Sequence, residues 1–516
     1  MLDTLERLLR FDYYFSVSQA EYKAQLLYRS CIDEADVIES LGPKPVLDIV
    51  DAVGGWSLTS TSSLRDLDFE YKLKSVQKYS TSALFHWYVR EGMHNTSRYE
   101  IFIHQGGLTL PSRDLYRNAE VVGAFAEYLK TVVTLLKGGS EAGDTRDLDY
   151  EVSAIIEFER ALADISDTEE SMKGKFLSLE EVDDRLPLAP FLLSWRDFFN
   201  DVINDLFVGD EPRTYVDGET KVWIQDDYIE KLSAIVADGL EDATDYSNEI
   251  EEVDFADRRN RFINTLNNYL TWRAIQPYVG YLSRDFQRAE KVFLKSLHGA
   301  QGREERWRTC VMNTNSAMGF AIAPMFVKQG FSEKAREIAY SMIEEIKTSF
   351  KSKIVKCSFK NLIISNSFVL TDRLEHLDWL DDPTRLMIRH KINNSTELMG
   401  YPDFVLNPAA LDERYHDFRV VEKEFLANQV RFHGFAVRKS LGMLAKDVDK
   451  RSWPLTFPPS TVNAFYLYPR NQILFPAGVL QPPLFSESQP MSLNFGHIGT
   501  FMGHEVRKGL KFFARS

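Results

Sequence analysis

The sequence predicts a mainly α protein, in which a large multi-helix N-terminal domain (residues 1–450) is followed by the start of an α+β domain (residues 451–516). Three observations lead to this fold class. Apolar residues recur at helical spacing through most of the chain, and prolines and β-rich runs gather near its C-terminal end. The chain is also longer, at 516 residues, than a single core usually requires.

Two apolar stripes with steps of three and four residues predict amphipathic helices in the first domain. Ser332 stands before the second stripe, where it can act as the helix N-cap. The segment from Ser233 to His298 is also predicted to be helical, because few glycines or prolines interrupt it. The stripes consist of Val152, Ile155, Ile156, Leu162 and Ile165, and of Ala335, Ile338, Ala339, Met342, Ile346 and Phe350.

The character of the sequence changes near Trp453. Prolines become frequent between residues 454 and 490, and two runs rich in β-branched and aromatic residues, 461–468 and 472–475, predict strands. We therefore place the domain boundary between residues 445 and 455.

Composition excludes several classes of protein. Hydrophobic residues make up 44% and charged residues 27% of the chain, which is typical of a folded globular protein. The net charge of −15 argues against a nucleic-acid partner, because phosphate contacts require clustered lysines and arginines. The sequence contains neither an apolar run long enough to span a membrane nor a signal peptide after Met1.

Two further features concern covalent chemistry. The three cysteines, Cys31, Cys310 and Cys357, lack the paired spacing of a zinc ribbon. Asn95, Asn393 and Asn394 begin Asn-x-Ser/Thr sequons, which weakly favour a secreted protein.

The candidate catalytic segment is residues 498–510, whose apolar positions predict a helix with one buried face. His504 and Glu505 lie in its middle. In a His-Glu-x-x-His helix, two histidines four residues apart bind one zinc ion and the glutamate activates the zinc-bound water. Here the position of the second histidine is Lys508, whose protonated amine has no lone pair to donate. The helix therefore lacks one zinc ligand.

The sequence around this helix resembles the neprilysin and endothelin-converting enzyme family of zinc metalloendopeptidases. The resemblance rests on four segments in the family's order: Val462-Asn-Ala-Phe-Tyr466, Asn471 to Pro483, Ser492-Leu-Asn-Phe-Gly496 and Ile498-Gly499. It implies a zincin-like catalytic domain that hydrolyses peptide bonds with a zinc-activated water.

The resemblance extends upstream through landmarks of the family's large helical domain, and it implies a disulfide between Cys31 and Cys310. It also implies peptide substrates and an extracellular or cell-surface ectodomain, held in family members by one N-terminal membrane helix. The landmarks are Leu27-Tyr-Arg-Ser-Cys-Ile-Asp33, Gly54-Gly-Trp56, Gly107 to Tyr116, Trp307-Arg-Thr-Cys310, Met399-Gly-Tyr-Pro-Asp403 and Val448 to Trp453.

Individual site residues are carried over from the family by position. Asn463 and Ala464 match the residues that hold the substrate backbone, and we expect them at an open strand edge. Leu484 and Phe501 match side-chain pocket walls, although the family more often has Phe and a smaller aliphatic residue there. His504 matches the first zinc ligand and Glu505 the general base.

The C-terminal residues depart from the family pattern of Thr-His-Gly-Phe-Asp. Arg507, Lys508, Leu510 and Lys511 differ, and only Gly509 is retained. His497 cannot replace the lost ligand, because seven residues of helix place it about 10.5 Å from His504. The family's glutamate ligand would lie beyond Ser516, and its anchor before Met1.

Two hypotheses follow for function. The first is a neprilysin-like family product, truncated at both ends, that binds no catalytic zinc and cleaves no peptide. The second is a pseudoenzyme that binds peptides or partner proteins without cleaving them. An active enzyme that uses other residues has no support, since we find no nucleophile elbow, phosphate loop or paired cysteine motif.

Overall fold

The computed structural model describes residues 2–10, 17–32, 37–59, 68–93, 95–138, 145–168, 171–187, 194–207, 215–240, 249–299, 305–356 and 382–509. The chain forms two compact units. Unit 1 comprises residues 1–28, 306–417 and 448–516, and unit 2 comprises residues 29–305 and 418–447. One of the crossings between units, at residues 447/448, falls near the predicted boundary at 450, but the first 450 residues contribute to both units.

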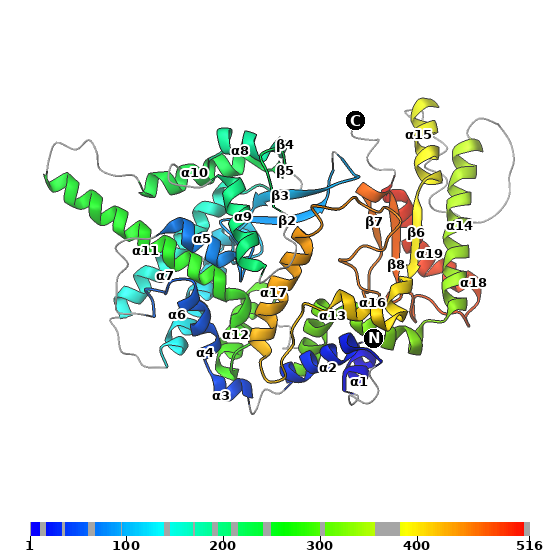
Figure 1. The fold of residues 1–516 in the computed structure, drawn as a ribbon, viewed down its shortest axis with the longest axis horizontal. Helices are drawn as coiled ribbons and strands as arrows, with labels where there is room; N and C mark the ends of the chain where they lie inside the picture. The colour runs from blue at the N-terminus through cyan, green and yellow to red at the C-terminus, as the bar shows by residue number, and fades with distance from the viewer. Residues whose placement is uncertain are drawn as a thin grey trace. The chain divides into compact units, whose positions relative to one another are not determined.

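Unit 2 is built mainly from helices packed around one large apolar core (Figure 1). The predicted stripe of α7 is buried in that core, since Val152, Ile155 and Leu162 are fully inaccessible to solvent. Its helices are α3 (Glu39–Leu41), α4 (Lys44–Ala52), α5 (Phe69–Gln77), η3 (Arg113–Arg117), α6 (Ala119–Leu136), α7 (Thr145–Ile165), α8 (Leu179–Arg185), α9 (Trp195–Leu206), α10 (Asp226–Leu240), α11 (Glu249–Val279), α12 (Arg284–His298) and α17 (Phe425–Leu441).

Unit 2 also contains a five-stranded sheet that the sequence did not predict. Its order is β1-β2-β3-β5-β4, with β3 and β5 parallel and the other pairs antiparallel. Alternate residues such as Trp87, Ile103 and Ile224 are buried in the core. The strands are β1 (Ser82–Ala83), β2 (Phe85–Glu91), β3 (Tyr99–Gln105), β4 (Lys175–Ser178) and β5 (Lys221–Ile224).

Unit 1 combines helices with a three-stranded sheet of order β6-β8-β7 (Figure 1). β6 pairs in parallel with β8, and β7 pairs antiparallel with β8 and forms an edge of the sheet. Its elements are α1 (Leu2–Arg10), α13 (Arg306–Gly330), α14 (Glu333–Lys356), α15 (Asp382–Asn393), β6 (Thr396–Gly400), η4 (Asp403–Leu406), α16 (Pro408–Arg414), β7 (Phe465–Leu467), η5 (Tyr468–Arg470), β8 (Gln472–Pro476), α18 (Met491–Gly496) and α19 (Ile498–Lys508). The helix α2 (Gln19–Ile32) begins in unit 1 and ends in unit 2.

Of two local predictions, the helix cap is confirmed and the strand is confirmed in part. Ser332 caps α14, because its hydroxyl accepts a hydrogen bond from the Ala335 N–H at 3.0 Å. The strand predicted over 461–468 is shorter than expected, since only Phe465–Leu467 pair with β8. The Asn463 side-chain oxygen accepts a hydrogen bond of 2.8 Å from the Ala464 N–H. This N–H is therefore not available to pair with a neighbouring strand.

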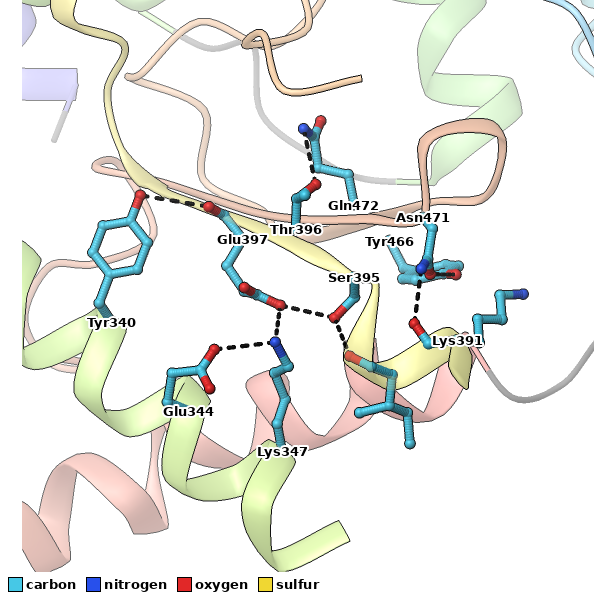
Figure 2. Close-up of polar contacts among 11 residues, drawn as sticks. Tyr340, Glu344, Lys347, Lys391, Ser395, Thr396, Glu397, Tyr466, Asn471 and Gln472 are labelled. Atoms are coloured by element: carbon cyan, nitrogen blue, oxygen red, sulfur yellow. Dashed lines mark hydrogen bonds and ion pairs between the residues drawn. The ribbon is translucent and has the colours of Figure 1, made fainter. Parts of the chain in front are cut away.

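A buried ion pair joins α14 to β6 (Figure 2). Lys347 is 4% exposed and its ammonium contacts the carboxylates of Glu397 and, at 3.0 Å, Glu344. The Ser395 hydroxyl lies 2.8 Å from Glu397 Oε1. Because a buried charge without a partner is costly, loss of either partner would destabilise the contact of β6 with α14.

Among the described residues, α13 is the one helix long and apolar enough to span a membrane. However, 72% of its apolar stretch is buried inside the structure, which is typical of a core helix.

Candidate active site

The candidate catalytic helix α19 forms because one of its faces is apolar. Ile498, Met502 and Val506 recur at four-residue steps and are at most 4% exposed. The predicted helix of residues 498–510 is therefore confirmed up to Lys508, and Leu510 and Lys511 lie outside the described residues. Phe501, in contrast, is 45% exposed.

His504 and Glu505 occupy different environments on this helix. The His504 side chain is 59% exposed, whereas that of Glu505 is 5% exposed. His504 Nε2 lies 3.9 Å from Glu505 Oε1. The two residues that the family resemblance assigned to chemistry are therefore adjacent, with the carboxylate withdrawn from solvent.

Lys508 pairs with the candidate general base. Its Nζ donates a hydrogen bond of 3.0 Å to Glu505 Oε1 across one helical turn. The other carboxylate oxygen, Oε2, is buried and has no hydrogen-bond partner among the described residues. The lysine thus supplies the positive charge beside Glu505. We did not predict this pairing from the sequence, although an i, i+3 spacing places two side chains on the same side of a helix.

The residues around α19 do not fit a zinc ion. Within the described ranges, no group of three or more His, Cys, Asp or Glu side chains could hold a metal. His497 is exposed at the N-cap of α19, seven residues before His504. A catalytic zinc site requires three protein ligands and a water, and here the ammonium of Lys508 stands where the second ligand belongs.

The predicted peptide-binding residues lie where the chain enters the edge strand β7. Asn463 is exposed, and Ala464 is buried with its N–H held by the Asn463 side chain. An open cavity of about 620 Å³ adjoins this segment, a volume within the usual range for ligand sites. It is lined by Leu2, Asp3, Arg308, Met312, Asn315, Ser460, Thr461 and Val462.

The two candidate pocket residues lie at different positions along α19. Leu484 is half-buried, and its carbonyl accepts a hydrogen bond of 3.3 Å from the Ile498 N–H at the start of the helix. Phe501 is exposed one turn further along. Their roles in a pocket remain predictions.

The disulfide implied by the resemblance agrees with the structure, in which Cys31 and Cys310 are both disulfide-bonded. Both residues are fully buried. Cys357 lies outside the described residues.

Comparison with known proteins gives two family matches. A model of the N-terminal part of "Peptidase family M13" matches residues 3–402, and a second model with the same description matches residues 463–514.

Curated relatives match 95% of this chain. An endothelin-converting enzyme homolog of Locusta migratoria is 34% identical over 495 residues and is covered to 61% of its length. Neprilysin-3 of Drosophila melanogaster is 34% identical over 498 residues and is covered to 57%. Human endothelin-converting enzyme 1 is 32% identical over 500 residues, also covered to 57%. The chain thus spans about three fifths of the length of these relatives.

Solved structures share the fold. The zinc metalloprotease Zmp1 of Mycobacterium tuberculosis, in complex with an inhibitor, has a TM-score of 0.71 at 20% identity, with 98% of this chain and 67% of that chain covered. PepO of Lactobacillus rhamnosis has a TM-score of 0.72 at 17% identity, with 98% and 70% covered. The predicted fold class is therefore confirmed.

Proposed function

Because this chain belongs to peptidase family M13, we propose that it is a neprilysin-like family member whose α19 helix binds no catalytic zinc and hydrolyses no peptide. One observation carries the proposal: Lys508 donates to the buried carboxylate of Glu505 at 3.0 Å. In a zinc peptidase that carboxylate accepts a proton from the metal-bound water. Lys508 thus occupies one oxygen of the carboxylate that would accept that proton.

The available ligands support the same proposal. Zinc binds through lone pairs on imidazole, thiolate or carboxylate groups, and α19 offers one imidazole, that of His504. The neighbouring ammonium of Lys508 also repels a divalent cation. We therefore assign zinc to the family and derive no zinc-dependent step for the residues of this chain.

The test measures zinc content and peptide hydrolysis in the same preparations. Purified protein is analysed for zinc by elemental analysis and is assayed with a fluorogenic peptide. We expect no stoichiometric zinc and no cleavage. The variant Lys508→His restores the two-histidine spacing, and we expect it to bind zinc more strongly than the parent chain. Stoichiometric zinc in the parent chain, with cleavage that Glu505→Gln abolishes, would contradict the proposal.

A second function, binding of an extended peptide without cleavage, has separate support. β7 is an edge strand, and peptides commonly bind by adding a strand to such an edge. Asn463 is exposed beside it. If its side chain rotates outward, the Ala464 N–H becomes free to donate to a peptide carbonyl. The cavity next to residues 460–462 offers space for a side chain of that peptide.

Fluorescence anisotropy tests this second function, with the same fluorogenic peptide as an uncleaved ligand. We expect saturable binding that Asn463→Ala weakens by about fivefold, since the variant lacks the side-chain amide that can bond to the peptide backbone and one hydrogen bond contributes about 1 kcal/mol. Asn393→Ala, at the exposed last residue of α15, is the matched control and should leave binding unchanged. Equal affinity of the parent and Asn463→Ala proteins would remove Asn463 from the site.

We also propose an extracellular or cell-surface location. The support is the disulfide-bonded state of Cys31 and Cys310, because disulfides persist in oxidising compartments and are rare in the cytosol. Thiol labelling of the protein in its native cells tests the proposal. Free thiols at both positions would contradict it.

A further inference from the structure

The three sequons differ in structure, although the sequence motif treats them alike. We propose that Asn95 is an N-glycosylation site of this protein and that Asn393 and Asn394 remain unmodified. The ligand class is an oligosaccharide attached through the side-chain amide nitrogen. The inference is independent of whether the chain binds or cleaves peptides.

Asn95 lies on the exposed turn that connects β2 to β3. Its side-chain oxygen, Oδ1, accepts a hydrogen bond of 3.1 Å from the N–H of Ser97, the third residue of the sequon. Its backbone carbonyl accepts from the Arg98 N–H at 3.1 Å. The turn is therefore held by the oxygen atoms of Asn95, and the fold does not use its amide nitrogen in any hydrogen bond of the described structure. A glycan can be attached there while every one of these contacts is kept.

In Asn394, by contrast, the side-chain amide nitrogen is hydrogen-bonded at the C-terminal end of α15. Its Nδ2 donates to the carbonyl of His390 at 2.8 Å and lies 3.1 and 3.2 Å from the two ring nitrogens of that histidine. The carbonyl belongs to the last turn of α15, and it also accepts a hydrogen bond of 3.0 Å from the backbone N–H of Asn394. A glycan on Nδ2 would remove a donor from this cap and would crowd the histidine ring.

In the sequon of Asn393, the hydroxyl of the third residue, Ser395, is hydrogen-bonded within the protein. The Ser395 hydroxyl lies 2.8 Å from Glu397 Oε1 and 2.9 Å from the carbonyl of Ile392. Figure 2 shows this hydroxyl within the polar network that also contains Lys347. The folded chain therefore uses the hydroxyl of this sequon in its own polar network, whereas the bond from Ser97 to Asn95 comes from the backbone N–H.

The proposed reaction is a glycosyl transfer from a lipid-linked oligosaccharide diphosphate. A bond forms between Asn95 Nδ2 and the anomeric carbon of the first sugar, and Nδ2 loses one proton. The bond from that carbon to the diphosphate oxygen breaks, and the diphosphate leaves with the electron pair. The donor and the transferase belong to the secretory pathway, whose oxidising lumen also suits the disulfide-bonded Cys31 and Cys310.

The experiment expresses the full chain in eukaryotic cells behind a cleavable secretion leader. An amidase that converts glycosylated Asn to Asp in ¹⁸O-labelled water marks each occupied site, and peptide mass spectrometry reads all three. We expect the label at Asn95 in most molecules and at neither Asn393 nor Asn394. An unlabelled Asn95, or label at Asn393 or Asn394 comparable to that at Asn95, would overturn the inference.

Matched variants separate the sequon from its surroundings. Asn95→Gln and Ser97→Ala should each remove one glycan from the protein on a gel, whereas Thr96→Ala, which keeps the sequon, should not. Where a variant fails to leave the cell, translation in the presence of microsomes gives the same readout before secretion. Loss of the glycan in Thr96→Ala together with its retention in Ser97→Ala would also overturn the assignment.

Discussion

Two buried glutamates, Glu159 in unit 2 and Glu505 in unit 1, have opposite hydrogen-bonding environments. Glu159 is fully buried, and it accepts from the Tyr116 hydroxyl, the Thr109 N–H at 3.0 Å and the Thr109 hydroxyl at 2.7 Å. Glu505 is 4% exposed, but Lys508 contacts one of its oxygens, and the other has no hydrogen-bond partner in the part of the chain that the structure describes. The first carboxylate is satisfied by its surroundings and the second only in part.

This difference separates a carboxylate with both oxygens bonded from one that keeps an oxygen available. Glu159 holds the segment of Thr109 and Tyr116, which belongs to a landmark shared with the peptidase family, and both of its oxygens are occupied. A general base must instead keep an oxygen free to accept a proton. Glu505 keeps one such oxygen, but Lys508 occupies the other.

The largest expected effect is on Glu159. Glu159→Ala should lower the free energy of unfolding of unit 2 by about 3–5 kcal/mol, because it leaves the buried donors of Thr109 and Tyr116 unpaired. Urea unfolding followed by tryptophan fluorescence measures this change. Glu159→Gln retains acceptor atoms and should cost less. Equal losses in the two variants would show that side-chain volume matters there, rather than hydrogen bonding.

The next effect is expected at Lys508. Lys508→Met should destabilise unit 1 by about 1–3 kcal/mol, because Glu505 then becomes a buried charge without a partner. Arg507→Met, on the exposed side of α19, is the neighbouring control and should change stability by less than about 0.5 kcal/mol. A second change, Glu505→Leu in the Lys508→Met protein, should recover part of the loss. Identical melting of the Lys508→Met and Arg507→Met proteins would argue against a stabilising ion pair.

A smaller effect depends on pH and concerns His86 on β2. Burial, and then the nearby charge of His104, lower the pKa of His86 from 6.5 to about 4. Its folded-state pKa lies below the unfolded value, so the unfolded chain binds more protons between pH 6.5 and about 4. The free energy of unfolding should therefore fall as the pH decreases through this window, by less than about 1.4 kcal/mol per pH unit.

Urea unfolding at several pH values measures this dependence. His86→Gln should flatten the slope, whereas His298→Gln, at an exposed position on α12, should leave it unchanged. Burial also lowers the pKa of His104, so a residual slope should remain in His86→Gln. A slope unaffected by His86→Gln would show that the imidazole of His86 can ionise within the folded unit at little cost.

The smallest expected effect is that of zinc on the parent chain. A metal that binds only the folded state raises the melting temperature, so the proposal that α19 binds no zinc predicts no shift on addition of zinc or of a chelator. Lys508→His should show a small rise with zinc. A rise of several degrees in the parent chain would mean that α19 holds a metal despite Lys508.

Local sequence by itself determined the helices, the cap of α14 and the choice of the candidate catalytic segment. Apolar residues at three- and four-residue steps predict a helix wherever it packs, and Ser332 bonds to a residue only three positions away. The sequence also shows Lys508 at the position of the second histidine, because that observation depends only on residue type and spacing.

Only the tertiary structure decided which distant segments pair. β6 at Thr396–Gly400 lies beside β8 at Gln472–Pro476, and β3 lies beside β5 although 115 residues separate Gln105 from Lys221. Such pairings depend on hydrogen bonds between segments far apart in sequence, which no local periodicity encodes. The burial of Glu505 and its contact with Lys508 also became known only from the structure. Spacing places the two side chains on one helical turn, but the packing of α19 decides how far they are removed from water.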